Sequence, residues 1–122
     1  MDKLHIVKLG GGLLEDSSAT ATALASFHAL TGHKILVHGG GSQASVLCEK
    51  LGIEPKMHNG RRITDDDALD VAVMVYAGLA NKTVVAGLQK LGTNAIGVSG
   101  ADANLIQANK RPVQDIDYGW AG

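Results

Sequence analysis

The stretch Leu36–Gln43, LVHGGGSQ, decides the fold, because an apolar run ends there in three consecutive glycines. Aliphatic and β-branched residues at 35–37 predict a short strand that is buried on both faces of a sheet. The glycines remove every side chain where the strand ends, so other groups can approach their N–H donors. We expect Ser42 to cap a helix over Gln43–Leu51, with Gly52 after its last turn. A strand, a glycine turn and a helix N-terminus together point N–H groups at an anion.

The same arrangement occurs once earlier in the chain. His5–Leu9 is an apolar-rich strand candidate, Gly10–Gly12 follow it directly, and Lys8 lies two residues before the first glycine. A helix is predicted between the two strands, with start signals at Glu15–Ser18 and a closing glycine at Gly32. Two such units fit a βαβ arrangement, in which both glycine turns lie at the carboxyl ends of neighbouring parallel strands. One run of three glycines is as often a flexible turn, but two at one sheet edge, beside a lysine, favour a phosphate or carboxylate site.

Length and composition restrict the classes of function. The 122 residues suffice for one modest domain, and 45% hydrophobic and 19% charged residues are ordinary for a soluble protein. The net charge of −1 argues against a nucleic-acid partner. The single cysteine, Cys48, excludes an internal disulfide and is expected to be a small buried hydrophobe in a cytoplasmic protein. No apolar run is expected to reach the length of a membrane span, and no signal-peptide pattern begins the chain. The five histidines show no metal-ligand spacing, so no metal site is predicted.

The stretch Asn59–Thr64, NGRRIT, follows a connection in which a short strand is predicted around Lys56–His58. Asn-Gly is a turn signal, and we expect Arg61 and Arg62 to project from the turn. An arginine pair in a loop is usually solvated. This loop nevertheless lies between the glycine units and a long helix, where a guanidinium could hold a carboxylate through two hydrogen bonds.

A long helix is predicted from Asp66 to about Lys90, with Thr64 or Asp65 as its cap. The acidic run Asp65–Asp67 suits the positive end of this helix, and it needs no metal to explain it. Apolar residues cover two faces of the helix, so we expect a homodimer joined through it in addition to core packing.

The remainder of the chain predicts further short strands. Asn94–Ser99, NAIGVS, is one candidate, and it ends at a Ser-Gly pair. The segments Leu105–Arg111 and Val113–Trp120 are two more, separated by Pro112.

These stretches together resemble the N-acetyl-L-glutamate kinases of the amino-acid kinase family. The matching stretches occur in the family's order, and their combination is specific although each one alone is not: KLGGG (8–12), LVHGGGSQ (36–43), NGRRIT (59–64), the helical stretch 77–83 and SGADAN (99–104). The resemblance covers the family's N-terminal half. Residues 1–122 are therefore interpreted as the acyl-glutamate-binding part of such a domain, without the nucleotide-binding C-terminal half.

The resemblance implies an α/β fold, a three-layer α/β/α sandwich with an open, mainly parallel sheet. It implies phosphorylation of the γ-carboxylate of an N-acyl-L-glutamate by ATP, with Mg²⁺ bound through the nucleotide. Lys8 matches the lysine that neutralises charge on the transferring phosphoryl group, and Gly11 matches a glycine whose N–H contacts phosphate. Gly40 and Gly41 match the pair that lines the acyl-glutamate site, and Arg62 matches the arginine that binds the substrate α-carboxylate.

Three alternatives stay open. Ala101 stands where many relatives have a lysine, which leaves N-succinyl-L-glutamate as a substrate in place of the N-acetyl compound. No position matches the family's second lysine or its organising aspartate, so the chain alone is expected to be inactive, or to be a non-catalytic ligand-binding module. Gly39-x-Gly41-x-x-Ala44 also satisfies a dinucleotide-binding fingerprint, although Asn59 stands where an acidic residue would bind ribose about twenty residues on.

Overall fold

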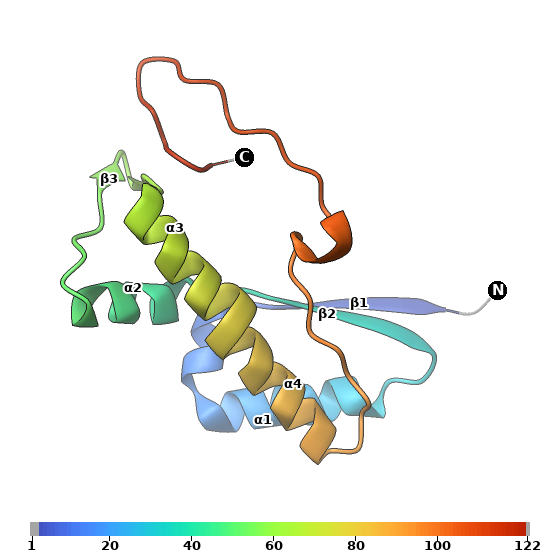
Figure 1. Cartoon of the computed structure of the whole chain (residues 1–122). Coiled ribbons are helices and arrows are strands. Elements are labelled where there is room, and N and C mark those ends of the chain that lie inside the picture. The colour runs from blue at the N-terminus through green and yellow to red at the C-terminus, as the bar shows by residue number, and fades with distance from the viewer. Residues whose placement is uncertain (1–2, 122) are drawn as a thin grey trace.

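The sheet at the centre of the fold has two parallel strands, β1 (Leu4–Leu9) and β2 (His33–His38). The computed structural model describes residues 3–121, and it pairs these strands in register from Leu4 opposite His33 to Leu9 opposite His38. A short 3₁₀ helix, η1 (Gly11–Glu15), and the helix α1 (Ser17–Ala29) connect them (Figure 1). Asp16 caps α1, because its carboxylate accepts from the backbone N–H groups of Ser18 and Ala19. The predicted βαβ unit is confirmed.

Helix α2 (Gly41–Lys50) follows β2, and a small antiparallel hairpin of β3 (Met57–His58) and β4 (Arg61–Arg62) comes next. A continuous helix then runs over 66–90. It consists of α3 (Asp66–Ala72), a π-helical segment η2 (Val73–Ala80) and α4 (Asn81–Lys90). A final 3₁₀ turn, η3 (Asp102–Asn104), interrupts the long tail that rises above the sheet in Figure 1.

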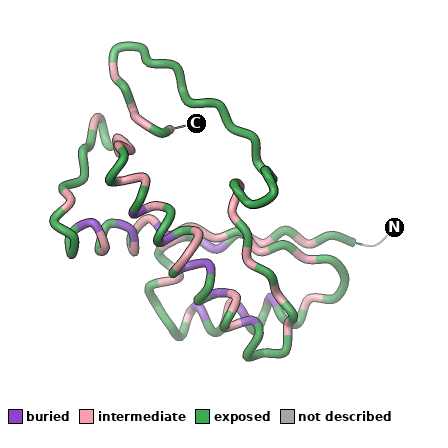
Figure 2. The backbone as a smooth tube through the Cα atoms, viewed as in Figure 1, coloured by how far each residue is buried: buried purple, intermediate pink, exposed green. Residues whose placement is uncertain are grey.

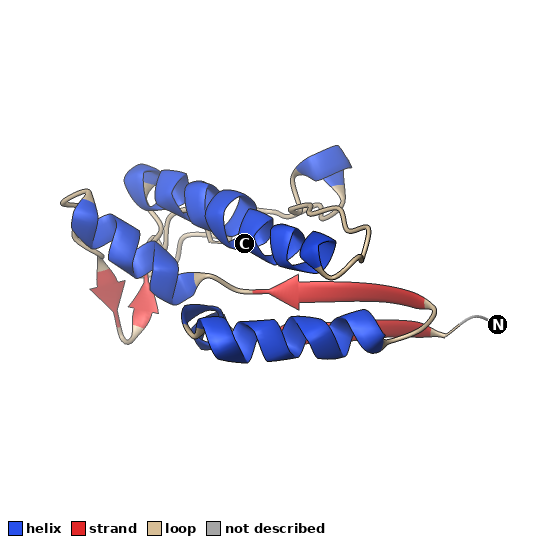
Figure 3. Cartoon of the chain, turned by 90° about the horizontal axis from the view of Figure 1, so that it is seen from below, coloured by secondary structure: helices blue, strands red, loops and turns tan. Residues whose placement is uncertain are grey.

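In Figure 3, α1 covers β1 and the long helix runs alongside β2. One buried cluster joins them to β1, and its members are Leu9, Leu24, Phe27, Val84 and Leu88. A second cluster joins α2 to the long helix, and its members are Ala44, Cys48, Val71, Val75 and Ala80. Each fully buried aliphatic side chain of this kind contributes about 1.5–3 kcal/mol. Cys48 is buried, as predicted.

The other face of the sheet is bare in the described part of the chain. Alternate residues of both strands point to it, and their exposed fractions are 52% for Leu4, 67% for Ile6, 49% for Ile35 and 45% for Val37. The α/β fold is therefore confirmed, whereas the described residues do not confirm the third layer, which stays a prediction. The strand prediction of burial on both faces is wrong for this chain.

The strands predicted after the long helix are absent from the described residues. Segment 94–99 is extended, but its carbonyl groups accept hydrogen bonds from side chains: Lys82 Nζ reaches Gly97 O at 3.2 Å and Gln89 Nε2 reaches Ala95 O at 3.0 Å. The tail beyond it makes one isolated parallel bridge, between Thr64 and Gly119. Figure 2 shows this tail almost entirely exposed. Alternating apolar residues alone do not make a strand without a neighbour to pair with.

The helix over 66–90 also corrects the expectation about apolar length. It is 25 residues long and contains an 18-residue window with a mean hydropathy of 1.5, which would suffice to cross a membrane by length and composition alone. Core helices of soluble proteins pass the same test, and 33% of the apolar window is buried here. The prediction considered only unbroken apolar runs, whereas the average over a window stays high because Val, Leu, Met and Ala outnumber the polar residues between them.

Candidate functional site

The two glycine turns meet at the carboxyl ends of β1 and β2. The N–H of Gly39 donates to the carbonyl of Leu9 at 3.3 Å. A Cβ placed on Gly11 would lie 3.4 Å from the backbone nitrogen of Gly40 and 3.5 Å from that of Gly41. A Cβ on Gly39 would lie 3.3 Å from the backbone nitrogen of Gly11, so the two turns pack backbone against backbone. Gly11, Gly40 and Gly41 therefore lie side by side, while their binding roles stay predictions.

The first glycine turn, Gly10–Gly12, has few contacts with side chains of the described residues. It leads into the 3₁₀ helix η1, whose preceding residue Gly10 provides no side-chain cap. Lys8 is exposed and forms no hydrogen bond or ion pair with another described residue. By the alternation along β1 it shares the bare face of the sheet with Ile6. An ammonium group without a partner, next to open backbone, is available to an anionic ligand.

The second turn leads directly into α2. The helix begins at Gly41, so the prediction that Ser42 caps it is wrong, and Gly40 occupies the cap position with no side chain to offer. The first intrahelical bond runs from Ala44 N–H to Gly40 O at 2.9 Å. The N–H groups ahead of it have no intrahelical acceptor, as at every helix start. They present partial positive charge to the space beside the two turns.

Arg62 reaches this helix start from the β3–β4 hairpin. Asn59 and Gly60 form the hairpin turn with positive φ values of 47° and 74°, so the arginines lie on a strand and not in the turn as we predicted. Arg62 Nη2 donates to Ser45 Oγ at 2.6 Å, and Ser45 Oγ donates to Gly41 O at 3.1 Å. The guanidinium thus lies against the first turn of α2.

An ion pair fixes the hairpin to the long helix. Lys56 Nζ lies 2.6 Å from Asp65 Oδ2, while Asp65 Oδ1 caps the helix by accepting from Ala68 N–H at 3.0 Å. The hydrogen bond and the charge of Lys56 lower the pKa of the Asp65 carboxyl, and the same contact raises the pKa of Lys56. Of the two caps that the sequence allowed, Asp65 is the one used.

The sequence analysis missed Tyr76. A Cβ on Gly40 would lie 3.3 Å from Val75 Cγ1 and 3.5 Å from Tyr76 Cδ1, and one on Gly41 would lie 3.3 Å from the Tyr76 hydroxyl. The π-helical segment η2 brings these two side chains over the second turn. Such segments are frequent at functional sites. No sequence rule that we used distinguishes a π-helix from an α-helix, so the signal was hidden in an ordinary apolar stripe.

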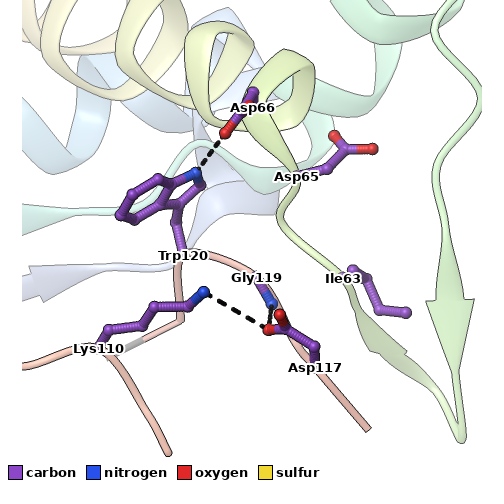
Figure 4. A pocket seen from close by; sticks show the side chains of 7 residues that line it. All are labelled: Ile63, Asp65, Asp66, Lys110, Asp117, Gly119 and Trp120. Atoms are coloured by element: carbon purple, nitrogen blue, oxygen red, sulfur yellow. Dashed lines mark hydrogen bonds and ion pairs between the residues drawn. The ribbon is translucent and has the colours of Figure 1, made fainter. Parts of the chain in front are cut away.

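A cavity of about 300 Å³ lies elsewhere, between the start of the long helix and the tail (Figure 4). Its polar groups satisfy one another: Trp120 Nε1 donates to Asp66 Oδ1 at 2.6 Å, and Lys110 Nζ lies 3.7 Å from Asp117 Oδ1. None of the predicted site residues lines it. Within residues 3–121, no group of three or more His, Cys, Asp or Glu side chains could hold a metal ion.

Comparison with known proteins decides the family. The model of the amino acid kinase family matches residues 3–119. The chain belongs to the amino acid kinase family. It is 56% identical over 121 residues to an acetylglutamate kinase of Phocaeicola vulgatus, covering 99% of this chain and 47% of that protein.

More distant relatives carry the same name. An acetylglutamate kinase of Parabacteroides distasonis is 53% identical over 122 residues, covering 100% of this chain and 48% of that protein. One of Methanopyrus kandleri is 38% identical over 123 residues, covering 98% of this chain and 47% of that protein. The chain spans about half the length of these curated relatives.

Proposed function

We propose that the protein carrying this chain phosphorylates the γ-carboxylate of N-acetyl-L-glutamate with ATP, in the cytoplasm, as a step of arginine biosynthesis. The chain would supply the acyl-substrate half of the site. The observation that carries the proposal is the meeting of the two glycine turns, with Lys8 preceding one and Arg62 bonded to the helix after the other. The names of the relatives support the same reaction.

The residues would divide the work by charge. Arg62 would exchange its bond to the neutral Ser45 hydroxyl for a bidentate pair with the substrate α-carboxylate, which is the stronger interaction. The backbone of Gly40 and Gly41 would line the acyl-glutamate beside its reacting carboxylate. Gly11 N–H would contact the phosphate. Lys8 would stabilise the charge that develops on the transferring phosphoryl group, because phosphoryl transfer depends chiefly on positioning and electrostatics.

Mg²⁺ would arrive with the nucleotide. The described residues offer no ligand cluster of their own, and Mg²⁺ in kinase sites is commonly held through substrate phosphates. ATP itself would bind mainly to the part of the relatives that this chain does not span, which is also where the family's second lysine and organising aspartate are expected. The isolated 122-residue chain is accordingly expected to have no kinase activity.

A homodimer through the long helix is part of the proposal. Val73, Met74, Tyr76 and Leu79 are exposed on the π-helical segment, with Leu79 at 60%. A second copy of the chain would cover this apolar patch. The dimer would therefore explain the high hydropathy of the helix without a membrane.

The test is to measure ADP release by the full-length protein with MgATP and either N-acetyl- or N-succinyl-L-glutamate. Turnover with the acetyl substrate at a higher kcat/KM than with the succinyl substrate supports the proposal, and the reverse order reassigns the acyl group. No ADP release with either substrate overturns it. A parallel assay on residues 1–122 should remain at the uncatalysed background.

A further inference from the structure

Side-chain hydrogen bonds tie the second glycine turn to the long helix. His38 ends β2, and its Nδ1 lies 2.8 Å from the carbonyl oxygen of Gly39. Its Nε2 lies 3.1 Å from Nδ2 of Asn81, the first residue of α4. A carbonyl oxygen only accepts and an amide NH₂ only donates, so His38 carries its proton on Nδ1 and presents a lone pair on Nε2.

The orientation of Asn81 is fixed from its other side. Asn81 Oδ1 accepts from Lys82 Nζ at 2.9 Å, and the same ammonium donates to Gly97 O at 3.2 Å. An ammonium group has no acceptor, so reversing the amide would place its NH₂ against three donors. Asn81 is only 6% exposed, where an unpaired amide is costly. The amide is therefore held in the one orientation that suits the neutral His38.

We propose that His38 and Asn81 are positioning residues of the acyl-substrate site. Three successive glycines have no side chains to fix their own backbone, which is free to adopt many conformations. The His38–Asn81 pair holds the Gly39 carbonyl and thereby sets the direction of the Gly40 and Gly41 N–H groups. This inference rests on the proposed function for the role of those two glycines. It adds two residues that act through the backbone and not by contact with the ligand.

The first test is kinetic and uses the full-length protein. Asn81→Leu keeps the approximate volume but removes both bonds, and we expect kcat/KM for N-acetyl-L-glutamate to fall at least tenfold. Gln89→Met is the matched control, since Gln89 on the same helix also donates to a downstream carbonyl but lies far along α4 from His38. The control should retain wild-type kinetics. Equal losses in the two variants would overturn the proposal.

The second test exploits the direction of the bond. Asn81→Asp offers His38 an acceptor where it now meets a donor, so the link survives only when His38 is protonated on both nitrogens. The charged group bonded to Asn81 is Lys82, which also acts weakly on Asp102, whose pKa is lowered chiefly by hydrogen bonds from Ser99. The ratio of variant to wild-type kcat/KM should be highest at low pH and fall as pH rises and His38 loses the second proton. A ratio independent of pH contradicts the proposal.

The third test does not depend on turnover. The ¹⁵N shifts of the His38 ring in the wild-type protein should show a protonated Nδ1 and an unprotonated Nε2, and a protonated Nε2 overturns the inference. Hydrogen exchange at the Gly39 amide, which donates to Leu9 O in the turn, should accelerate at least tenfold in Asn81→Leu and not in Gln89→Met. If the wild-type protein releases no ADP, the proposed function fails, while these two readouts still decide whether the pair holds the turn. If Asn81→Leu does not fold, Asn81→Asp and the wild-type ring shifts decide.

Discussion

The two glycine turns share a sequence pattern but are held in different ways. The turn at 10–12 enters a short 3₁₀ helix, and Lys8 before it has no hydrogen bond or ion pair with any of residues 3–121. The turn at 39–41 opens a ten-residue helix and is contacted by His38, by Tyr76 and, through Ser45, by Arg62. Side chains from three elements thus reach the second turn or the helix start after it, whereas no side chain among residues 3–121 forms a hydrogen bond with the first turn. This difference fits the division of roles that we propose, in which the first turn would place charge near the transferred phosphate and the second would hold the acyl substrate.

The largest effect is expected for Lys8→Ala, which should lower the rate of phosphoryl transfer more than it weakens substrate binding. In the full-length protein we expect kcat to fall by about two orders of magnitude or more, with a smaller change in KM, because the lysine acts on transition-state charge. Steady-state kinetics measure this effect, with Lys3→Ala, just before the opposite end of β1, as the control. A rise in KM at unchanged kcat would assign Lys8 to ground-state binding of ATP and remove the distinction between the turns.

Arg62→Ala should affect substrate binding beside the second glycine turn. Removing a charge-assisted partner of the substrate carboxylate should weaken binding by roughly 2–4 kcal/mol, mostly as a higher KM for the acyl-glutamate. Arg61→Ala is the matched control, since Arg61 is the neighbouring exposed arginine on the same strand and no bond to α2 involves it. An unchanged KM in Arg62→Ala would contradict the proposal that Arg62 binds the substrate α-carboxylate.

Alanine in place of single glycines tests the difference in packing directly. Gly40→Ala puts a Cβ 3.3 Å from Cγ1 of Val75, which is itself fully buried. Overpacking of this kind lowers the free energy of unfolding by about 1–3 kcal/mol. Gly12→Ala meets nothing within 4 Å and should leave the free energy of unfolding unchanged or slightly improved. Urea denaturation of both variants measures the contrast. Similar losses at the two positions would mean that the second turn is no more tightly packed than the first.

The smallest effect is expected at the ion pair that fixes the Arg62 hairpin. Because Lys56 lowers the pKa of Asp65, the pair stabilises the fold above the ordinary carboxyl pKa of 3.8, and this contribution is lost as pH falls through the lowered value. Lys56→Met should therefore reduce the urea midpoint slightly at pH 6, and the difference from wild type should vanish at strongly acid pH. The pKa of Asp65, followed by NMR, should rise in the variant. A midpoint difference that persists unchanged into strong acid would assign the effect to the methylene groups of Lys56.

Local patterns predicted the βαβ unit and the meeting of the glycine turns. The strands around residues 7 and 36, the cap at Asp65 and the long helix all follow from short-range chemistry, namely apolar alternation, capping carboxylates and helical periodicity. The resemblance to the family supplied Lys8, Gly11 and Arg62 as candidates. Of these, the structure places Gly11 against the second turn and Arg62 against α2, whereas no contact tests the role of Lys8.

The failures have long-range causes. Segment 94–99 has a strand-like sequence, but Lys82 and Gln89 occupy carbonyl groups that a neighbouring strand would otherwise use. The role of Ser42 as a cap was lost because the helix begins one residue earlier, with Gly40 packed beneath Tyr76. Tyr76 itself belonged to an apolar stripe in the sequence, and only the π-helical geometry brings it over the glycines.

The contact between residue 97 and Asn81 restricts which substitutions the chain can accept. A Cβ at residue 97 would collide with Oδ1 of Asn81 and lie 2.7 Å from Val85 Cγ2, so no other amino acid fits while Asn81 keeps its place. The two positions are sixteen residues apart in the chain and yet are not free to drift separately. A lineage that replaces Gly97 must therefore also replace Asn81, either earlier or at the same time. It would then lose the hydrogen bond from the amide to His38, and with that bond the contact that fixes the Gly39 carbonyl.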